Sequence, residues 1–282
     1  MILVTGATGN VGRELTRQLL DAGERIRLLT RSPSTVSVPA GAEVVGGAEV
    51  VGGDLGRPAT LGPALVGVRR LFLNGPPGAA RGVLEVARAH GVRRVVVLSS
   101  GNARATREWD AIGGMHAATE RAVAASGLDW TALRPGAFAS NALAWAPGIR
   151  AESVVRQAYP LAARATIHPA DIAAAAVATL LGDGHGGQAY ELTGGESLTF
   201  ADEVATIGAA IGRPVRLEPL SPEQARARMV QVMPEAIADT LLRLWAEIDG
   251  TIAPVSDTVR RLTGSAPRTF ADWAKEHAET FR

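Results

Sequence analysis

The chain has 282 residues, of which 46% are hydrophobic and 20% charged, and its net charge is +1. This length suits one large domain or a domain with a small second lobe. The balanced charge argues against nucleic-acid binding, and the absence of cysteine excludes disulfides, Cys-ligated zinc, iron–sulfur clusters and thiol catalysis. No apolar run is long enough to span a bilayer, and the first residues already form a strand pattern. We therefore expect a cytoplasmic protein without a membrane partner.

The basic residues are almost all arginine. Of the 29 lysines and arginines, one is a lysine, Lys275, seven residues from the end of the sequence. Any mechanism that needs a lysine in an internal motif, such as a P-loop or a Tyr-x-x-x-Lys pair, is therefore excluded over nearly the whole chain. Tyrosine is equally scarce, with Tyr159 and Tyr190 alone.

Strand and helix patterns alternate through the first half of the chain. Apolar runs predict strands at Ile2–Val4, Arg25–Thr30, Glu49–Gly52, Arg70–Leu73, Arg93–Leu98 and Trp130–Arg134. Apolar residues at helical spacing predict helices at Asn10–Ala22, Pro58–Val66, Ala79–Ala89 and Asp110–Ser126. The alternation predicts an α/β fold, a doubly wound parallel sheet with helices on both faces.

A six-residue unit, GAEVVG, occurs twice in residues 41–52. A short duplication that lengthens the loop before the third strand is the simplest interpretation, because solenoid repeats have longer periods and more copies. Either copy could form the strand, and the one next to Asp54 is favoured.

After Pro135 the pattern becomes less regular. An alanine-rich helix is expected from His168-Pro169-Ala170-Asp171 to Leu181, followed by a strand at Gln188–Leu192. Further helices are expected at Thr199–Ile211, Pro222–Met233, Pro234–Ile248, Asp257–Leu262 and Phe270–Phe281. We expect a first domain over residues 1–135, with parts of 136–195, and a smaller, mostly helical lobe over 136–282 that covers the substrate, with no clean linker between them.

The strongest functional signal is the segment TGATGNVG, which directly follows the first strand and precedes the first helix. Gly6 permits a tight turn, Gly9 allows the backbone to approach a pyrophosphate, and Gly12 allows close packing of helix and strand. The phosphates of a dinucleotide are expected at the helix N-terminus, where N–H groups and the helix dipole favour negative charge. The expected contacts are Gly6, Thr8, Gly9, Asn10, Val11 and Gly12.

The end of the second strand indicates which dinucleotide binds. NAD sites place a carboxylate there for the ribose 2′-OH, but this chain has Thr30-Arg31-Ser32. Arg31 could pair with a 2′-phosphate, so NADP(H) is favoured; the alternative is a solvated loop arginine.

Other strand ends should line the cofactor groove, because ligands of open α/β sheets lie beyond the carboxyl ends of the strands. Asp54 suits the adenine amino group, although a turn or capping aspartate is the alternative. The remaining expected contacts at these ends are Leu55, Asn74, Gly75, Pro76 and Ser99.

The segments TGATGNVG, VGGDL, VVVLSSGNA, HAATERAVAASGLDWTALRPGAFASN and HPADIAAA together resemble the NmrA-like group of atypical short-chain dehydrogenases/reductases, over nearly the whole chain. The resemblance implies a Rossmann domain with a small C-terminal lobe and a preference for NADP(H). The group includes quinone, triphenylmethane-dye and phenylpropanoid-type reductases, and also cofactor-sensing regulators without catalytic activity. It further implies that Pro135 and Phe138 lie near the nicotinamide, and that Phe138, Asn141 and Trp145 line the substrate pocket. The alternative for Trp145 is packing within the lobe.

The chain departs from ordinary short-chain dehydrogenases at the catalytic pair. Where those enzymes have Tyr-x-x-x-Lys, this chain has His116 and Glu120. His116 is the candidate proton donor, because imidazole titrates near neutrality; the alternative is a histidine that orients the cofactor ribose or lies on a polar helix face. Glu120, one turn later, could favour the imidazolium or contact the ribose, or it could be a surface partner.

Strand-end side chains could hold a substrate carbonyl. Ser100 is the first candidate by position, together with Ser99 and Asn102. The alternative for the serines is to cap the turn that follows the strand. No segment has metal-ligand spacing, so no metal is expected.

Three functions remain open. The first is an NADPH-dependent reductase of a small, largely apolar acceptor such as a quinone, an enone or a polycyclic carbonyl. The second is a non-catalytic protein that senses the NADP+/NADPH ratio. The third, ranked last, is an epimerase or isomerase with bound cofactor, because the sequence offers no strong base. A small molecule is the expected partner, and the chain could be a monomer or a homodimer.

Overall fold

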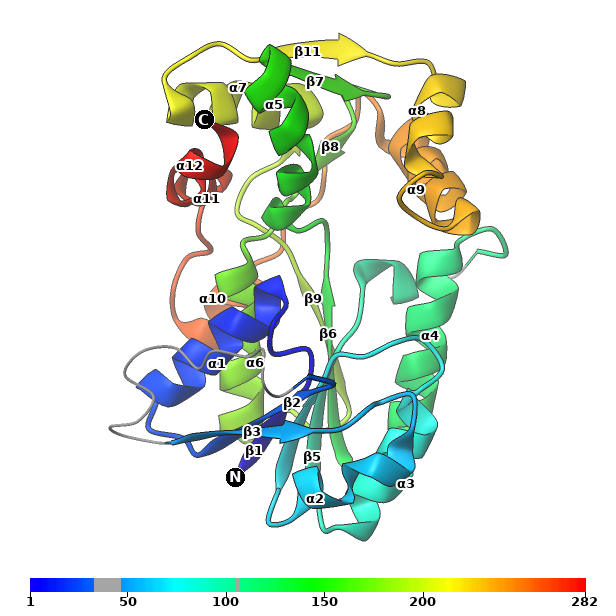
Figure 1. Ribbon diagram of the computed structural model, residues 1–282, viewed down its shortest axis with the longest axis vertical. Helices are drawn as coiled ribbons and strands as arrows, with labels where there is room; N and C mark the ends of the chain where they lie inside the picture. Colours follow the sequence, from blue (N-terminus) through cyan, green and yellow to red (C-terminus); the bar gives the residue numbers. More distant parts are fainter. Residues whose placement is uncertain (33–46, 105–106) are drawn as a thin grey trace. The chain divides into compact units, whose positions relative to one another are not determined.

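The computed structural model describes residues 1–32, 47–104 and 107–282 (Figure 1). The chain divides into two compact units. Unit 1 consists of Met1–Ala105, Gly113–Pro135 and Pro169–Glu191, and unit 2 consists of Thr106–Ile112, Gly136–His168 and Leu192–Arg282.

Unit 1 is built on a seven-stranded sheet with the order β3-β2-β1-β4-β5-β6-β9. Its strands are β1 (Ile2–Val4), β2 (Ile26–Thr30), β3 (Ala48–Gly52), β4 (Arg70–Leu73), β5 (Arg94–Leu98), β6 (Asp129–Pro135) and β9 (Gln188–Leu192). Leu3 of β1 pairs with Arg27 of β2 and with Leu71 of β4, both in parallel. The central strands are continuous buried apolar runs, because helices cover both faces of a parallel sheet.

The strand order reverses between β1 and β4. From β1 the chain moves outward to β2 and β3 and then returns to place β4 on the other side of β1. In open α/β sheets, ligands bind at such a reversal, beyond the carboxyl ends of the strands. We therefore expect a ligand site at the loops that follow β1 and β4.

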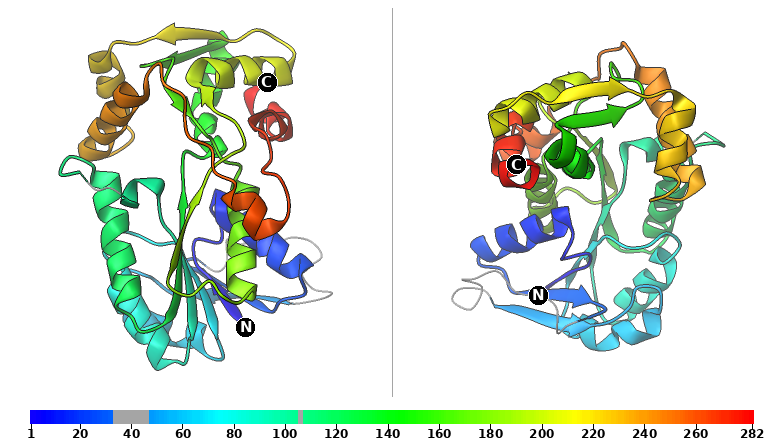
Figure 2. Two further views of the ribbon diagram at one scale, coloured as in Figure 1. Left: turned by 180° about the vertical axis from the view of Figure 1, so that it is seen from behind. Right: turned by 45° about the horizontal axis from the view of Figure 1, so that its top comes forward.

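Two pairs of helices cover the sheet of unit 1. On one face α1 (Asn10–Asp21) packs against α6 (Pro169–Leu181), and on the other lie α3 (Ala80–Ala89) and α4 (Ala111–Ala124) (Figures 1 and 2). A 3-10 turn, η2 (Pro58–Leu61), leads into the short α2 (Gly62–Leu65), and η3 (Gly101–Arg104) follows β5. The amphipathic spacing of α1 buries Val11, Leu15 and Leu19.

Unit 2 is mostly helical around two small sheets. Strand β7 (Val154–Gln157) pairs in parallel with β11 (Arg216–Pro219), and β8 (Ala163–Arg164) pairs antiparallel with β10 (Leu198–Thr199). Its helices are η4 (Ala139–Trp145), α5 (Ala146–Glu152), α7 (Phe200–Ile211), α8 (Pro222–Met229), α9 (Glu235–Ile248), α10 (Thr258–Thr263), α11 (Phe270–Glu276) and α12 (Ala278–Phe281). Trp273 lies at the centre of its main core.

The predicted doubly wound parallel sheet is confirmed, and β3 is the second GAEVVG copy. The first copy lies outside the described residues. Three predicted helices differ in detail. The helix expected at Pro58–Val66 is the 3-10 turn η2 followed by the short α2. The helix expected at Phe270–Phe281 breaks at His277, whose ring stacks on Trp273 with 4.5 Å between centroids, and the helix expected at Pro222–Met233 ends at Met229. The substrate-covering role of residues 136–282 stays a prediction.

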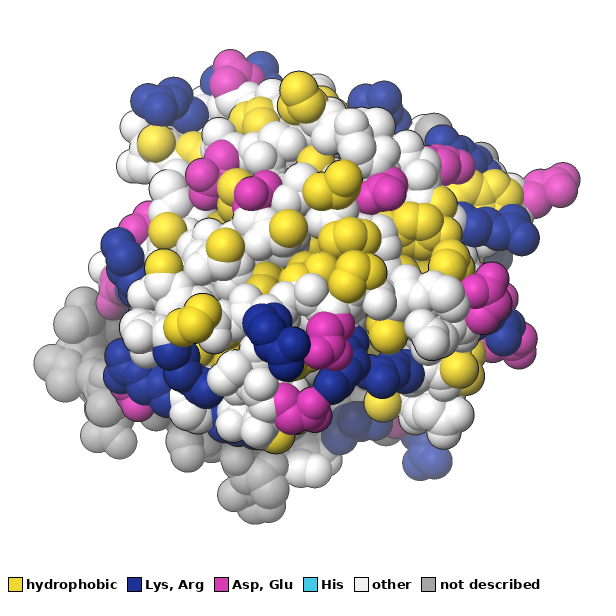
Figure 3. Space-filling model, turned by 90° about the horizontal axis from the view of Figure 1, so that it is seen from above, with side chains coloured by type: hydrophobic (Ala, Val, Ile, Leu, Met, Phe, Trp, Pro, Cys, Tyr) yellow, Lys and Arg dark blue, Asp and Glu magenta, His cyan; other side chains and the backbone are white. Residues whose placement is uncertain are grey.

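The surface drawn in Figure 3 mixes charges of both signs with hydrophobic side chains. Large apolar side chains that are exposed include Leu161, Val232 and Ile252. Among the helices of residues 1–32, 47–104 and 107–282, none is long and apolar enough to cross a membrane.

Candidate functional site

The loop between β1 and α1 requires glycine at two positions. Gly6 has a φ of 65°, in the left-handed region, where a side chain is strained. A Cβ atom on Gly12 would lie 2.1 Å from the carbonyl oxygen of Gly6, so the first turn of α1 can pack against the loop only without a side chain there. A dinucleotide-binding motif needs its glycines for the same reason, because they allow the helix to pack closely against the loop and the strand.

The N-terminus of α1 is open to a ligand. Its N-cap is Gly9, and no side chain of the described residues caps it. Thr8, Gly9 and Asn10 are exposed. A helix N-terminus with exposed N–H groups binds phosphate, so the residues present fit the pyrophosphate of a dinucleotide.

Thr5 and Asn74 join the loop to the end of β4. The Thr5 hydroxyl accepts a hydrogen bond of 2.7 Å from the Asn74 N–H and lies 3.0 Å from the carbonyl oxygen of Phe72. The Asn74 side chain lies against Gly6, where an added Cβ would approach its amide nitrogen to 2.8 Å. The two loops at the strand reversal therefore form one surface. Sequence reasoning missed Thr5, although its place at the start of TGATGNVG was visible.

A cavity of about 270 Å³ lies beyond the carboxyl ends of β4 and β5, beside α4; we call it the His116 cavity. It is lined by Leu73, Asn74, Gly75, Pro76, Pro77, Ala79, Ala80, Val97, Leu98, Met115, His116 and Thr119. The structure thus brings the predicted donor together with three predicted cofactor contacts. His116 is the one titratable side chain among these lining residues, and most of the others are apolar.

Glu120 does not line the cavity but is held by its neighbours. Arg134 donates two hydrogen bonds to its carboxylate, at 2.9 Å to Oε1 and 2.6 Å to Oε2. The Ser99 hydroxyl donates a third, at 2.5 Å to Oε1. These bonds tie α4 to the ends of β5 and β6.

The environment keeps Glu120 ionised. Burial raises the pKa of the Glu120 carboxyl. The hydrogen bonds from Arg134 and Ser99 and the charges of Arg134 and His116 together lower it by more, so the pKa lies below its ordinary value. Glu120 is therefore a poor proton donor at neutral pH, and Ser99 uses its hydroxyl on this carboxylate. Arg134 was not predicted as a partner, because nothing in the spacing of residues 120 and 134 indicates that they meet.

Other predicted contacts at the strand ends have local partners. Asp54 Oδ1 accepts a hydrogen bond of 2.9 Å from the Gly56 N–H, as a turn aspartate does. Leu55 lies against Gly75, where an added Cβ would approach its Cδ1 to 2.7 Å. Ser100 Oγ accepts a hydrogen bond of 3.3 Å from the backbone N–H of the half-buried Asn102, as expected if this serine caps the turn after the strand.

Arg31 and Pro135 lie at the ends of their strands in unit 1. Arg31 directly follows β2 and is exposed, whereas Pro135 ends β6 and is buried. The exposed guanidinium leaves Arg31 accessible to a ligand in solution.

The three residues assigned to the substrate pocket by resemblance lie in unit 2. Phe138 precedes η4 and forms a bridge with Ile167, and Asn141 is exposed. Trp145 packs edge-on against Phe200, with 5.9 Å between ring centroids. The structure therefore gives Trp145 a packing partner within unit 2, Phe200, as the alternative interpretation of this residue expects. In the ranges 1–32, 47–104 and 107–282, no three His, Asp or Glu side chains gather to hold a metal ion.

Comparisons with known proteins identify the family. The NAD(P)H-binding family model matches residues 6–183. The (4-alkanoyl-5-oxo-2,5-dihydrofuran-3-yl)methyl phosphate reductase of Streptomyces griseus is 43% identical over 100% of this chain and 99% of its own length. The NAD(P)H azoreductase of Xenophilus azovorans is 36% identical over 100% of this chain and 99% of its own.

A solved structure has the same fold. It is the NADPH-dependent quinone oxidoreductase of Escherichia coli in complex with NADPH, with a TM-score of 0.81 and 29% identity over 98% of this chain and 99% of that chain. The resemblance to the NmrA-like reductases is confirmed. The chain belongs to the NAD(P)H-binding family, and it is a reductase with a nicotinamide dinucleotide as its cofactor.

Proposed function

We propose that this chain reduces a small, largely apolar, conjugated acceptor, such as a quinone, an enone or a polycyclic carbonyl, with NADPH. The observation that carries the proposal is the His116 cavity, a mostly apolar space at the strand reversal with one titratable side chain in its wall. NADPH, when bound, supplies a hydride from C4 of its nicotinamide ring. The residues of the chain bind and orient the acceptor and deliver the proton.

The supply of protons favours a conjugated acceptor. An isolated ketone gives a localised alkoxide, which needs a strong general acid as the hydride arrives. A quinone or an enone gives a delocalised anion, for which one imidazole or water is sufficient. Because Glu120 is held ionised by Arg134, His116 is the donor that the cavity offers.

The names of the relatives support the same class of acceptor. They are a quinone oxidoreductase, an azoreductase and a reductase of an alkanoyl-furanone phosphate. A quinone, an azo group and an acylated furanone all hold the reducible bond in a conjugated system. We infer that the acceptor of this chain does so too.

We infer that NADPH is preferred over NADH. Arg31 stands exposed after β2, where an NAD site would have a carboxylate, and its planar fork can pair with a 2′-phosphate. The quinone oxidoreductase of similar fold is NADPH-dependent. Calorimetric titration should give at least about tenfold tighter binding of NADPH than of NADH, or about 1.4 kcal/mol. Arg31→Ala should reduce this difference in affinity. Equal affinities in the native chain would overturn the preference.

The reaction is tested by following NADPH oxidation with a quinone and with an isolated ketone. The quinone should be reduced at the higher rate. His116→Ala should lower kcat/KM for any measurable ketone reduction by about 10²-fold or more, and for the quinone by less than about tenfold. His90→Ala, an exposed histidine after α3 outside the cavity lining, serves as the matched control and should change neither rate. Equal losses on both acceptors would contradict the donor role of His116.

A non-catalytic sensor of NADP(H) is the alternative that the sequence left open, and the reductases among the relatives count against it. The observation in its favour is that both members of the usual Tyr/Lys pair are replaced, and that Glu120 serves as a structural partner of Arg134. A sensor would bind NADP+ more tightly than NADPH. It would not oxidise NADPH, whichever acceptor is added. The reductase proposal requires turnover.

A further inference from the structure

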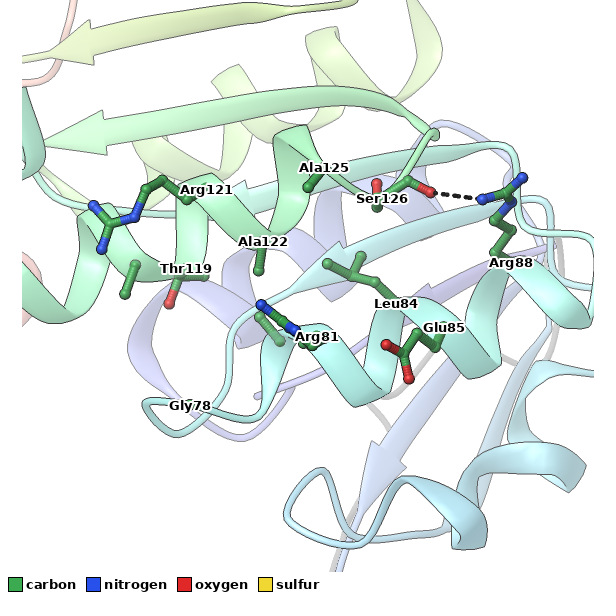
Figure 4. A pocket seen from close by; sticks show the side chains of 12 residues that line it. Gly78, Arg81, Leu84, Glu85, Arg88, Thr119, Arg121, Ala122, Ala125 and Ser126 are labelled. Atoms are coloured by element: carbon green, nitrogen blue, oxygen red, sulfur yellow. Dashed lines mark hydrogen bonds between the residues drawn. The ribbon is translucent and has the colours of Figure 1, made fainter.

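A second hollow adjoins the His116 cavity. It is a groove of about 800 Å³ between α3 and α4, which we call the α3–α4 groove. Ala80 and Thr119 line both spaces, so the groove begins where the cavity ends. Small side chains of α4 form one wall, and larger side chains of α3, among them Leu84, form the other (Figure 4).

The groove carries an excess of positive charge. Three arginines, Arg81, Arg88 and Arg121, line it together with one carboxylate, Glu85. Arg88, at the far end, donates to the carbonyl oxygen of Ser126 at 3.5 Å. Arg81 lies near the shared wall and extends from α3 toward Ala122 on α4 (Figure 4).

Arg81 and Arg121 differ from most arginines of the described ranges. Arg27, Arg94 and Arg134 are each bonded to a carboxylate. Arg81 and Arg121 form no ion pair or side-chain hydrogen bond with the residues of 1–32, 47–104 and 107–282. The Arg81 guanidinium reaches into the groove toward Ala122, whereas that of Arg121 extends from α4 away from α3 (Figure 4). An unpaired guanidinium in a groove with excess positive charge matches a phosphate monoester, which carries about −1.5 to −2 charges at neutral pH.

We infer that the α3–α4 groove binds a phosphate monoester carried by the acceptor, with Arg81 as its ligand. The inference rests on the proposed function, because it places the reducible ring in the His116 cavity. The acceptor would pass its phosphate arm across Ala80 and Thr119 into the groove. The groove would then select phosphorylated acceptors, whereas the cavity alone would reduce unphosphorylated ones more weakly.

The test compares a hydroxyethyl-substituted cyclohexenone with its phosphate monoester as acceptors for NADPH oxidation. The native chain should show at least about tenfold higher kcat/KM for the phosphate ester. Arg81→Gln should remove this difference by raising KM, and leave kcat/KM for the free alcohol within about twofold. Arg25→Gln makes the same charge change at an exposed arginine before β2, outside the groove lining, and should leave the preference intact. Equal kcat/KM for ester and alcohol in the native chain, or equal losses on both in Arg81→Gln, would overturn the inference.

A binding measurement separates this inference from the proposed function. If no acceptor is reduced, the proposed function fails, whereas calorimetric binding of the phosphate ester that disappears in Arg81→Gln would still support the groove. Inorganic phosphate should bind at least about tenfold more weakly than the ester, and equal binding would overturn a site built for the acceptor. A drop in NADPH affinity at unchanged NADH affinity in Arg81→Gln would assign the arginine to the cofactor instead, and would also overturn it.

Discussion

Two arginine–glutamate pairs, one in each unit, have the same chemistry and different surroundings. In unit 1, Arg134 and Ser99 bind Glu120, and the two charged side chains are 20% and 11% exposed. In unit 2, Arg164 and Thr166 bind Glu203, and the two charged side chains are 12% and 2% exposed. Each glutamate thus has one guanidinium and one hydroxyl as partners.

The pKa values of the two glutamates shift in opposite directions. For Glu120, burial is outweighed by the bonds and charges of its partners, and the pKa falls. For Glu203, burial is the larger effect, and the pKa rises although Arg164 and Thr166 oppose the rise. Burial also lowers the pKa of Arg164, whose Nε has no partner among the described residues. Because the partners are of the same kind, the loss of solvation decides in which direction the pKa of each paired carboxylate shifts.

Removal of the Glu203 carboxylate should lower the stability of the fold more than any other change considered for the two pairs. Replacing Glu203 with Leu leaves Arg164 buried over the Phe200 ring, 3.6 Å from its centroid, without a counterion. We expect a loss of about 3–5 kcal/mol in the free energy of unfolding, measured by urea denaturation. The double variant Arg164→Met/Glu203→Leu should recover most of this loss, because it removes both buried charges. A double variant less stable than the single one would show that the pair itself stabilises the fold.

A smaller effect is expected at Glu120. Glu120→Leu leaves Arg134 half-buried with access to water, so the same measurement should give a loss of about 1–3 kcal/mol. A loss equal to that of Glu203→Leu would remove the distinction between the two pairs.

The pH dependence should also separate the pairs. Glu120, with a lowered folded pKa, contributes stability above the unfolded value of about 4.3 and loses it as the pH falls through the folded value. Glu203, with a raised folded pKa, contributes most below the unfolded value and loses stability as the pH rises through the folded value. The difference in the free energy of unfolding between the native chain and Glu120→Gln should therefore decrease as the pH is lowered. The same difference for Glu203→Gln should decrease as the pH is raised toward neutrality. Urea denaturation across this range checks both, and parallel trends would contradict the opposite shifts.

Removal of the hydroxyl groups should lower the stability of the fold least. Ser99→Ala removes one of three bonds to Glu120, and about 1 kcal/mol should be lost. Thr166→Val should cost more, because Glu203 is the more deeply buried acceptor. Denaturation midpoints of the two variants give the comparison, and the reverse order would count against burial as the cause.

The sequence predicted the parts of the molecule that rest on local patterns. The continuous apolar runs of β1, β4 and β5 are typical of strands covered on both faces, and Gly6 and Gly12 mark the loop because each has a backbone reason for being glycine. The same patterns placed His116 at the strand ends, since the helix after β5 must return over them.

The rest could not be predicted, because it depends on which side chains meet in space. Glu120 was expected to support the His116 imidazolium, contact the ribose or pair at the surface, and its carboxylate instead binds Arg134 and Ser99. The strands of unit 2 have two to four residues and mixed burial, so no period reveals them; β8 and β10 are examples. The contacts of Trp145 with Phe200 likewise follow from tertiary packing alone.

The most direct test of the proposed reduction is the transfer of an isotope. NADPH carrying deuterium at C4, in each of the two stereochemical forms, is incubated with the chain and a cyclohexenone, and the product is examined by mass spectrometry. We expect one of the two forms to place one deuterium on a carbon of the saturated ketone, with stoichiometric formation of NADP+. Unlabelled product from both forms, or NADPH that binds but is never oxidised, would contradict a reductase at the His116 cavity.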